Sequence, residues 1–186
     1  PGLRSHPDHA VVEQQRMNPG YMIYFEFANE ELAKHFINLL RYFRMIENAT
    51  SLGKNETLAE RPAATSSSSM DSETLKKSGI DPAGIRMSVG IEAGEDVLRE
   101  LAATFEILRR YGDRLDESLY NALNRHFMAR DSYGHFLIRG IPELQMGQPS
   151  DEYHQRWLNS LSEGPLKEIG TLIHEATKID YYHPMS

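Results

Sequence analysis

The sequence predicts an α/β fold in which amphipathic helices pack on a sheet. Residues 84–89 alternate between apolar and polar side chains, which is typical of a strand with one buried face. Residues 21–27 are rich in aromatic and aliphatic side chains, as strands are. Residues 30–43 and 95–109 repeat apolar residues at helical spacing. These patterns predict helices laid on a sheet.

Size and composition exclude several classes of protein. A chain of 186 residues fits one domain or two small ones, and its net charge of -7 argues against a nucleic-acid partner. No apolar run approaches the roughly 20 residues that span a bilayer, so no membrane partner is expected. The absence of cysteine excludes disulfides and favours a cytoplasmic protein. Because the chain begins at Pro1 rather than Met, we expect a fragment of a longer protein.

The first part of the chain is predicted to alternate helices and strands. A short helix is expected over residues 10–17 and a strand over residues 21–27. Asn29 is a suitable N-cap for the helix over residues 30–43, because its side chain can accept a hydrogen bond from the first turn. A brief strand over residues 45–50 follows. The aromatic and leucine residues of the second helix are expected to form core.

The predicted strand at residues 84–89 carries one arginine. Ile85, Met87 and Val89 fall on one side, and Arg86 and Ser88 fall on the other. Arg86 has two interpretations. It is either a solvated position whose aliphatic stem covers apolar surface, or an anion clamp whose planar guanidinium binds a carboxylate through two parallel hydrogen bonds. The pattern alone leaves both open.

The helix over residues 95–109 is predicted to bury one apolar stripe. A short helix over residues 72–77 and a turn over residues 79–82 are expected before the strand at residues 84–89 that precedes it. The stripe recurs at helical spacing and is expected to face the sheet. It consists of Val97, Leu98, Leu101, Phe105 and Leu108.

The last third of the chain is predicted to be mostly helical after a seam at residues 111–113. One helix is expected over residues 115–128 and a short strand over residues 134–142. Two further helices are expected over residues 151–161 and 165–178. The titratable side chains near the end are interpreted as surface residues rather than metal ligands, and these are His174, Asp180 and His183.

Four motifs in the first part occur in a characteristic order. Residues 51–53 read Ser-Leu-Gly, residues 56–58 Glu-Thr-Leu, residues 61–63 Arg-Pro-Ala, and residues 84–92 Gly-Ile-Arg-Met-Ser-Val-Gly-Ile-Glu. This order resembles the C-terminal domain of the pyridoxal-phosphate (PLP) enzymes of cysteine and methionine metabolism, the trans-sulfuration family. That family includes cystathionine gamma-synthase, cystathionine lyases and methionine gamma-lyase. In it, the Glu-Thr-Leu motif begins a helix.

The resemblance implies a fold, and it implies that substrate binding and PLP binding lie in different domains. Residues 1–110 would form the C-terminal domain of a fold-type I PLP enzyme, a sheet with helices on one face. Arg86 would bind the α-carboxylate of an amino-acid substrate, and Ser51 would help to hold it. The lysine that binds PLP would lie in a large domain upstream, so no catalytic or cofactor-binding residue is assigned here. A homo-oligomer formed through that large domain is expected.

The sequence departs from the family at several positions. Arg61 stands where the family has His, and Ser66 and Ser67 stand where it has Thr and His. The polar run over residues 65–69 is nevertheless interpreted as a loop within the domain. Thr50 replaces a Glu that meets the distal amino group of cystathionine in many members. Cystathionine is therefore a less certain substrate than the sulfur amino acids as a class.

The last part of the chain has a different resemblance. Residues 134–142 read Gly-His-Phe-Leu-Ile-Arg-Gly-Ile-Pro, which resembles the N-terminal part of clavaminate-synthase-like oxygenases. Those enzymes use iron(II) and 2-oxoglutarate. Residues 111–186 would then be an incomplete oxygenase segment whose iron ligands lie beyond Ser186, and no metal site is expected within this chain.

The combined prediction is a fragment across the junction of a two-enzyme fusion. Its first activity would be a PLP-dependent lyase or transferase reaction, elimination or replacement, on a sulfur-containing or related amino acid. Two alternatives remain open. The oxygenase is the main activity of the parent in one, and the chain is a non-catalytic interaction module in the other.

Overall fold

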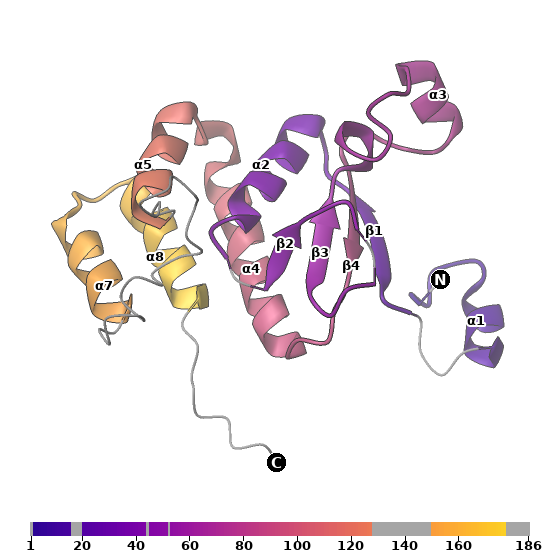
Figure 1. Ribbon diagram of the computed structural model, residues 1–186, viewed down its shortest axis with the longest axis horizontal. Coiled ribbons are helices and arrows are strands. Elements are labelled where there is room, and N and C mark those ends of the chain that lie inside the picture. Colours follow the sequence, from indigo (N-terminus) through magenta and orange to yellow (C-terminus); the bar gives the residue numbers. More distant parts are fainter. Residues whose placement is uncertain (1, 16–19, 44, 52, 128–149, 178–186) are drawn as a thin grey trace, which may run out of the picture.

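A computed structural model describes residues 2–15, 20–43, 45–51, 53–127 and 150–177. Its elements follow the chain from the N-terminal α1 to the C-terminal α8 (Figure 1). They are α1 (His9–Gln15), β1 (Met22–Glu26), α2 (Glu30–Leu40), β2 (Ile46–Asn48), β3 (Thr57–Glu60), the 3-10 turn η1 (Pro62–Ala64), α3 (Ser72–Lys77), β4 (Gly84–Ser88), α4 (Gly94–Tyr111), the 3-10 turn η2 (Gly112–Arg114), α5 (Glu117–Phe127), α7 (Ser150–Ser160) and α8 (Pro165–Thr177).

Four strands form one mixed sheet in the order β1-β4-β3-β2. Strand β4 pairs antiparallel with β1 and β3, and β2 pairs parallel with β3. The strands predicted over residues 21–27, 45–50 and 84–89 are confirmed as β1, β2 and β4. The helix start predicted at Glu56–Leu58 is wrong, because Thr57 and Leu58 open strand β3. The β-branched Thr57 suits a strand that is paired on both sides.

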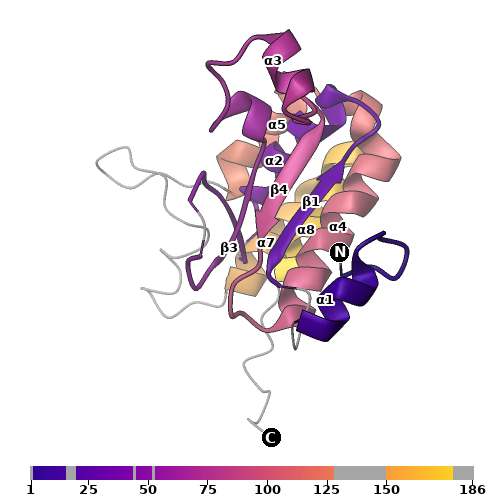
Figure 2. The ribbon, with the colours of Figure 1, turned by 90° about the vertical axis from the view of Figure 1, so that its right-hand side faces the viewer.

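The two faces of the sheet have different surroundings. Ile85 and Met87 of β4 lie on the face covered by α2 and α4, and both are buried. The opposite face carries the alternate residues, which in β4 are Arg86 and Ser88. Figure 2 shows the sheet beside α4, with α3 projecting beyond its end. The alternation predicted for residues 84–89 is confirmed.

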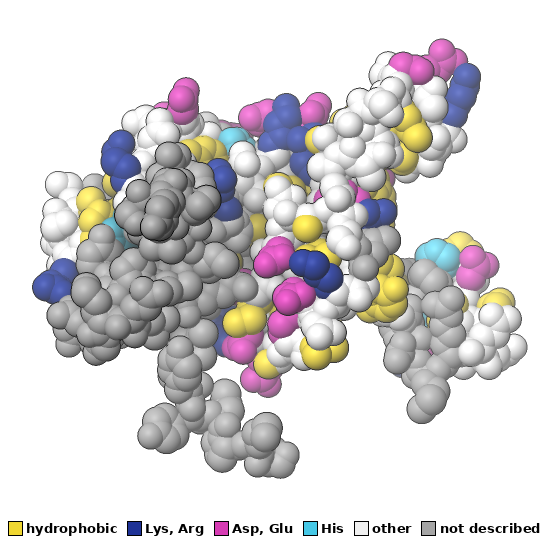
Figure 3. All heavy atoms as spheres, viewed as in Figure 1, with side chains coloured by type: hydrophobic (Ala, Val, Ile, Leu, Met, Phe, Trp, Pro, Cys, Tyr) yellow, Lys and Arg dark blue, Asp and Glu magenta, His cyan; other side chains and the backbone are white. Residues whose placement is uncertain are grey.

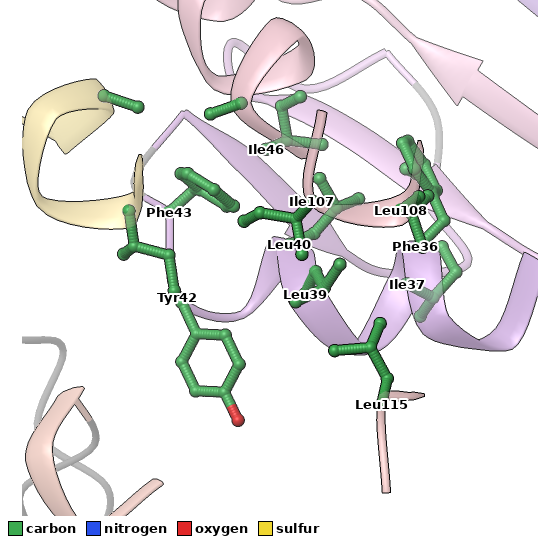
Figure 4. Close-up of a cluster of buried hydrophobic side chains, with 14 of the residues drawn as sticks. Phe36, Ile37, Leu39, Leu40, Tyr42, Phe43, Ile46, Ile107, Leu108 and Leu115 are labelled. Carbon is green, nitrogen blue, oxygen red and sulfur yellow. The ribbon is translucent and has the colours of Figure 1, made fainter. Parts of the chain in front are cut away.

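Helix α2 starts where the sequence predicts and ends earlier. The Asn29 side chain accepts a hydrogen bond from the backbone N–H of Leu32 at 2.9 Å, which confirms the predicted N-cap. The helix ends at Leu40, earlier than predicted, and Tyr42 and Phe43 lie buried in the turn that follows. Figure 4 shows the Phe43 ring beside Leu40 of α2 and Ile107 of α4, and the Tyr42 ring pointing away from them.

Helix α4 buries the predicted stripe only in part. Val97 and Leu108 are buried, whereas Leu98 is 65% exposed and Phe105 is 42% exposed. The Phe105 ring still packs on the ring of Phe25 in β1, so this side of the helix faces the sheet.

Two residues of α4 outside the predicted stripe, Glu100 and Thr104, are also buried. The helix contacts α8 as well as α2, so more than one of its sides is covered. Apolar periodicity alone does not show which partners a helix has.

The C-terminal helices pack on the side of α4 that faces away from the sheet (Figure 1). Ile169 and Ile173 of α8 belong to the same buried cluster as Ile107 and Leu108 of α4. A polar contact joins the turn after α2 to α5, because Tyr42 Oη donates to Asn124 Oδ1 at 2.8 Å. The two predicted C-terminal helices are confirmed as α7 and α8.

Three further predictions concern the C-terminal part of the chain: one helix start differs, one assignment is wrong, and one set of residues is not described. The predicted helix over residues 115–128 begins at Glu117, after η2. His174 is 2% exposed, so its assignment to the surface is wrong: it lies on the face of α8 that packs inward. The strand predicted over residues 134–142 falls outside the described residues, as do Asp180 and His183. Within the described part of the chain, no helix is long and apolar enough to cross a membrane.

Candidate functional site

Arg86 lies at the centre of β4 on the face of the sheet opposite α2 and α4. Its cross-strand partners are Tyr24 of β1 and Glu60 of β3. Residues directly opposite one another on neighbouring strands have side chains within contact range. The sheet therefore places a phenol, a guanidinium and a carboxylate in one row, which we call the Arg86 row.

The guanidinium of Arg86 is only partly engaged. Its Nη2 atom forms an ion pair with Glu60 Oε1 and donates to the backbone carbonyl of Thr50 at 3.2 Å. Its Nε atom is buried and has no hydrogen-bond partner among the described residues. The side chain as a whole is 27% exposed. Arg86 is thus fixed at Nη2, while part of its side chain remains exposed and can meet an anionic ligand.

Glu60 is the buried acid of the row. Its side chain is 2% exposed, and the turn that follows β3 supplies its other partners. Thr65 Oγ1 donates to Oε2 at 2.5 Å, and Ser66 Oγ donates to Oε1 at 3.3 Å. The Thr65 backbone N–H donates to the Arg61 carbonyl at 3.1 Å, which closes the turn. The predicted loop over residues 65–69 is confirmed as part of the domain.

Ser51 lies beside this row, at the start of the segment between β2 and β3. It is exposed and follows Thr50, whose carbonyl accepts from Arg86. Gly53 has a positive φ of 72°, which glycine adopts without strain, and its N–H points to Ser88 Oγ at 3.4 Å. The structure therefore brings both predicted site residues, Arg86 and Ser51, to the same part of the sheet face.

The far end of this segment is pinned to the chain after β4. Thr57 Oγ1 donates to Glu92 Oε2 at 2.8 Å, and the Thr57 N–H donates to the other oxygen of that carboxylate. The Gly90 N–H donates to Thr57 Oγ1 at 2.9 Å. A Cβ at Gly90 would lie 2.1 Å from the Asn55 carbonyl oxygen, so only glycine allows this approach. These contacts hold the segment in place next to Arg86.

Arg61, where the resemblance has His, has a structural role. Its Nη2 donates to Glu30 Oε1 at 2.8 Å and to the Pro82 carbonyl at 3.1 Å. The hydrogen bond from Arg61 lowers the pKa of Glu30 below its ordinary value. Arg61 therefore ties the start of α2 to the turn before β4. Of the other two departures, Ser66 contacts Glu60 and Ser67 is buried.

Tyr24 lies at the edge of the Arg86 row, and its side chain contacts the turn just before β4. Its Oη accepts a hydrogen bond from the Asp81 N–H at 3.2 Å. Burial raises the pKa of Tyr24, so the phenol stays neutral. Figure 3 shows hydrophobic side chains gathered over β1, where Met22 and Tyr24 are exposed.

Glu60 was missed by sequence reasoning. A weak signal was present, since Leu58 and Glu60 share one face of a strand. The sequence does not give the β3–β4 register, however, and that register is what pairs Glu60 with Arg86. Nothing local in the sequence marks this glutamate as different from the exposed ones.

The described lysines do not form a site for PLP. All of them are exposed or half-buried on helices and turns. Four are held in ion pairs with nearby glutamates, whereas a lysine that binds PLP needs a free amino group directed into a cavity. The four are Lys34, Lys54, Lys77 and Lys167.

Comparison with known proteins identifies the family of the first part of the chain. Residues 1–106 match the family model "Cys/Met metabolism PLP-dependent enzyme". The cystathionine beta-lyase of Lactococcus lactis subsp. cremoris is 41% identical over 106 residues, 57% of this chain and 27% of that protein. The L-methionine gamma-lyase of Fusobacterium nucleatum subsp. polymorphum is 36% identical over 107 residues, 57% of this chain and 26% of that protein.

Solved structures give the same assignment. The cystathionine gamma-lyase of Lactobacillus plantarum, complexed with L-serine, matches with a TM-score of 0.51 and 32% identity, covering 56% of this chain and 27% of that one. The chain thus spans about a quarter of the length of the relatives that it matches. The family match covers more than half of the 186 residues. The chain therefore belongs to the Cys/Met metabolism PLP-dependent enzyme family.

Proposed function

We propose that the Arg86 row binds the α-carboxylate of an amino acid in a PLP-dependent lyase or transferase of trans-sulfuration type. The observation that carries the proposal is the state of Arg86, which is anchored through Nη2 while part of its side chain stays exposed on this face of the sheet. An amino-acid carboxylate can accept from the exposed part of the guanidinium. Ser51 and the backbone around it would complete the site.

The chemistry that this site performs is orientation. A planar guanidinium and a planar carboxylate form two parallel hydrogen bonds, which fix the direction of the bound group as well as its position. Holding the carboxylate decides which bond at Cα faces the reacting partner, and such alignment lowers the barrier of the chemical step. PLP, when bound, supplies the electron sink for that step.

The substrate class follows from the relatives and from Thr50. The matched proteins are named as lyases of cystathionine and methionine, and we propose a sulfur-containing or related amino acid for this chain. Thr50 exposes no charged group that could meet the distal amino group of cystathionine. Methionine and its analogues are therefore the first substrates to test.

We propose further that PLP is bound mainly by a separate large domain and that oligomerisation occurs through it. Residues 1–110 are the proposed family domain, and a cytoplasmic location remains a prediction from the lack of cysteine. The oxygenase interpretation of residues 111–186, with iron(II) and 2-oxoglutarate, receives no support from the comparisons. We do not propose it.

A binding experiment on the protein tests the proposal. Titration with L-methionine, followed by ¹⁵N-detected NMR, is expected to shift the Arg86 Nε–H signal and the amide signals of Ser51 and Gly53. L-methioninamide, which lacks the carboxylate, is expected to leave them unchanged. Arg86→Gln should weaken methionine binding at least tenfold, about 1.4 kcal/mol, because the charged donor is lost.

The matched control is Arg109→Gln, which removes an exposed arginine from α4. It should bind methionine like the unmodified protein. Equal shifts with methionine and methioninamide would show that the carboxylate is not what Arg86 recognises. Undiminished binding by Arg86→Gln would refute the site itself.

A further inference from the structure

We infer that Glu60 is the positioning residue of the carboxylate site. Its buried carboxylate holds Arg86 at Nη2, so that the guanidinium offers its remaining N–H groups to the ligand. The contact between the two side chains stands on the structure, whereas the identity of the ligand rests on the function proposed above.

The first argument is the geometry of the pair. A carboxylate facing a guanidinium squarely engages two nitrogens at once. Here Glu60 pairs with Nη2, and the Thr50 carbonyl accepts from the same nitrogen. These two contacts fall on one nitrogen of Arg86, whose side chain stays 27% exposed. An anchor of this kind leaves the exposed part of the guanidinium for a second planar anion.

The second argument is that Glu60 is held without the help of Arg86. Thr65 and Ser66 donate to its two oxygens, and the side chain is 2% exposed. Thr65 is itself fixed by the hydrogen bond from its backbone N–H to the Arg61 carbonyl. An acid held in this way stays in place whether or not the ligand is bound. Arg86, at 27% exposed, is the more accessible partner.

The third argument concerns charge. The Glu60 and Arg86 charges cancel, so a ligand carboxylate meets a pair with no net charge. Attraction by net charge therefore contributes little, and recognition depends on the directional hydrogen bonds of the free N–H groups. We expect the site to prefer a planar carboxylate to a spherical anion. A site with an unpaired arginine would bind both.

The position of Arg86 can be measured directly. In ¹⁵N NMR spectra of the protein, a restrained and buried arginine Nε–H gives a separate signal that exchanges slowly with water. Glu60→Ala is expected to move the Arg86 signal into the group of exposed arginines and to weaken L-methionine binding at least tenfold. Glu60→Gln keeps an oxygen that can accept from Nη2, and we expect it to retain the separate signal.

The matched control is Glu47→Ala, which removes an acid from the neighbouring strand β2, where it pairs with Lys54. It should change neither the Arg86 signal nor binding. Anion choice is tested with acetate and chloride: acetate alone should shift the Arg86 signal in the unmodified protein, and both should shift it in Glu60→Gln.

The outcomes separate this inference from the proposed function. An unchanged Arg86 signal in folded Glu60→Ala would overturn the inference, as would an equal effect of Glu47→Ala. If methionine shifts nothing in the unmodified protein but Glu60→Ala frees the Arg86 signal, the positioning contact stands and the proposed function fails. Should Glu60→Ala not fold, Thr65→Ala serves instead, since loosening Glu60 should broaden the Arg86 signal. A sharp, unmoved signal there would contradict the inference.

Discussion

Gly84 and Tyr24 fit together as a small and a large residue on neighbouring strands. A Cβ at Gly84 would lie 2.1 Å from Tyr24 Oη, 2.7 Å from its Cζ and 2.9 Å from the Asp81 carbonyl oxygen. Gly84 does not have a positive φ, so the requirement for glycine comes from this close approach alone. The phenol therefore occupies the space that a side chain at residue 84 would fill.

Gly84→Ala is expected to lower the free energy of unfolding by about 1–3 kcal/mol, because the new methyl group displaces Tyr24. Urea denaturation measures this as a lower midpoint with an unchanged slope. Tyr24→Ala in the same molecule should recover part of the loss. Gly94→Ala is the control, because nothing lies within 4 Å of a Cβ at Gly94. Equal stability of the two alanine variants would contradict this explanation.

At the scale of single residues, Arg86 was predictable and Glu60 was not. The alternation of residues 84–89 is local, so the sequence alone puts Arg86 on the polar face of a strand. Its pairing with Glu60 depends on strand register, which long-range packing decides. The assignment of Ser51 and Arg86 as substrate contacts stays a prediction.

At the scale of elements, α7 packs on α8 where α8 has a glycine. A Cβ at Gly170 would lie 2.8 Å from Trp157 Cζ3 and 2.9 Å from Leu158 Cδ2. Trp157 stacks on His126 of α5, with the ring centroids 3.7 Å apart and the rings inclined by 8°. The glycine thus lets α7 approach α8 closely enough for the indole to reach α5.

Gly170→Val is expected to destabilise the protein by about 1–3 kcal/mol, since a branched side chain cannot share this space with the indole. Trp157 is the only tryptophan in the sequence, so its fluorescence reports the site directly. We expect emission to shift to longer wavelength as water reaches the ring. Thr171→Val, one residue further on the exposed side, should leave the spectrum unchanged, and a shift in both variants would argue against a local contact.

The order of helices and strands was largely predictable, because caps and periodicity are local signals. The full buried face of α4 was not, because α8 packs on this helix from residues more than 50 positions away. Of the predicted stripe, Val97 and Leu108 are buried and Leu98 is exposed. Strand β3 was misassigned as a helix start because a motif was interpreted without its pairing partner.

At the scale of the whole molecule, the family domain and the C-terminal helices share one core. The family match ends at residue 106, inside α4, and the apolar residues of that helix continue beyond it to Tyr111. Ile107 and Leu108 lie in the same buried cluster as Ile169 and Ile173. The domain boundary predicted at residues 110–111 therefore does not divide the core. It remains a proposal about which residues derive from the PLP-enzyme family.

A chain that ends at Tyr111 is expected to self-associate and to melt at a lower temperature. It would expose Ile107 and Leu108, and fully burying a side chain of this size contributes about 1.5–3 kcal/mol. Light scattering and thermal unfolding measure the two effects. Removal of residues 1–15 is the control, because α1 has no buried residue. A monomeric truncated chain with an unchanged melting temperature would show that the shared core is not needed.

The continuity of α4 has a mechanical consequence. An unbroken helix of 18 residues resists bending, because each turn is braced by its own backbone hydrogen bonds. Within the described residues, α4 contacts α2 on the side of the sheet and α8 on the other, so one continuous helix joins the sheet that carries Arg86 to the C-terminal helices. A domain or protein bound to those helices would therefore have a defined orientation relative to the proposed carboxylate site.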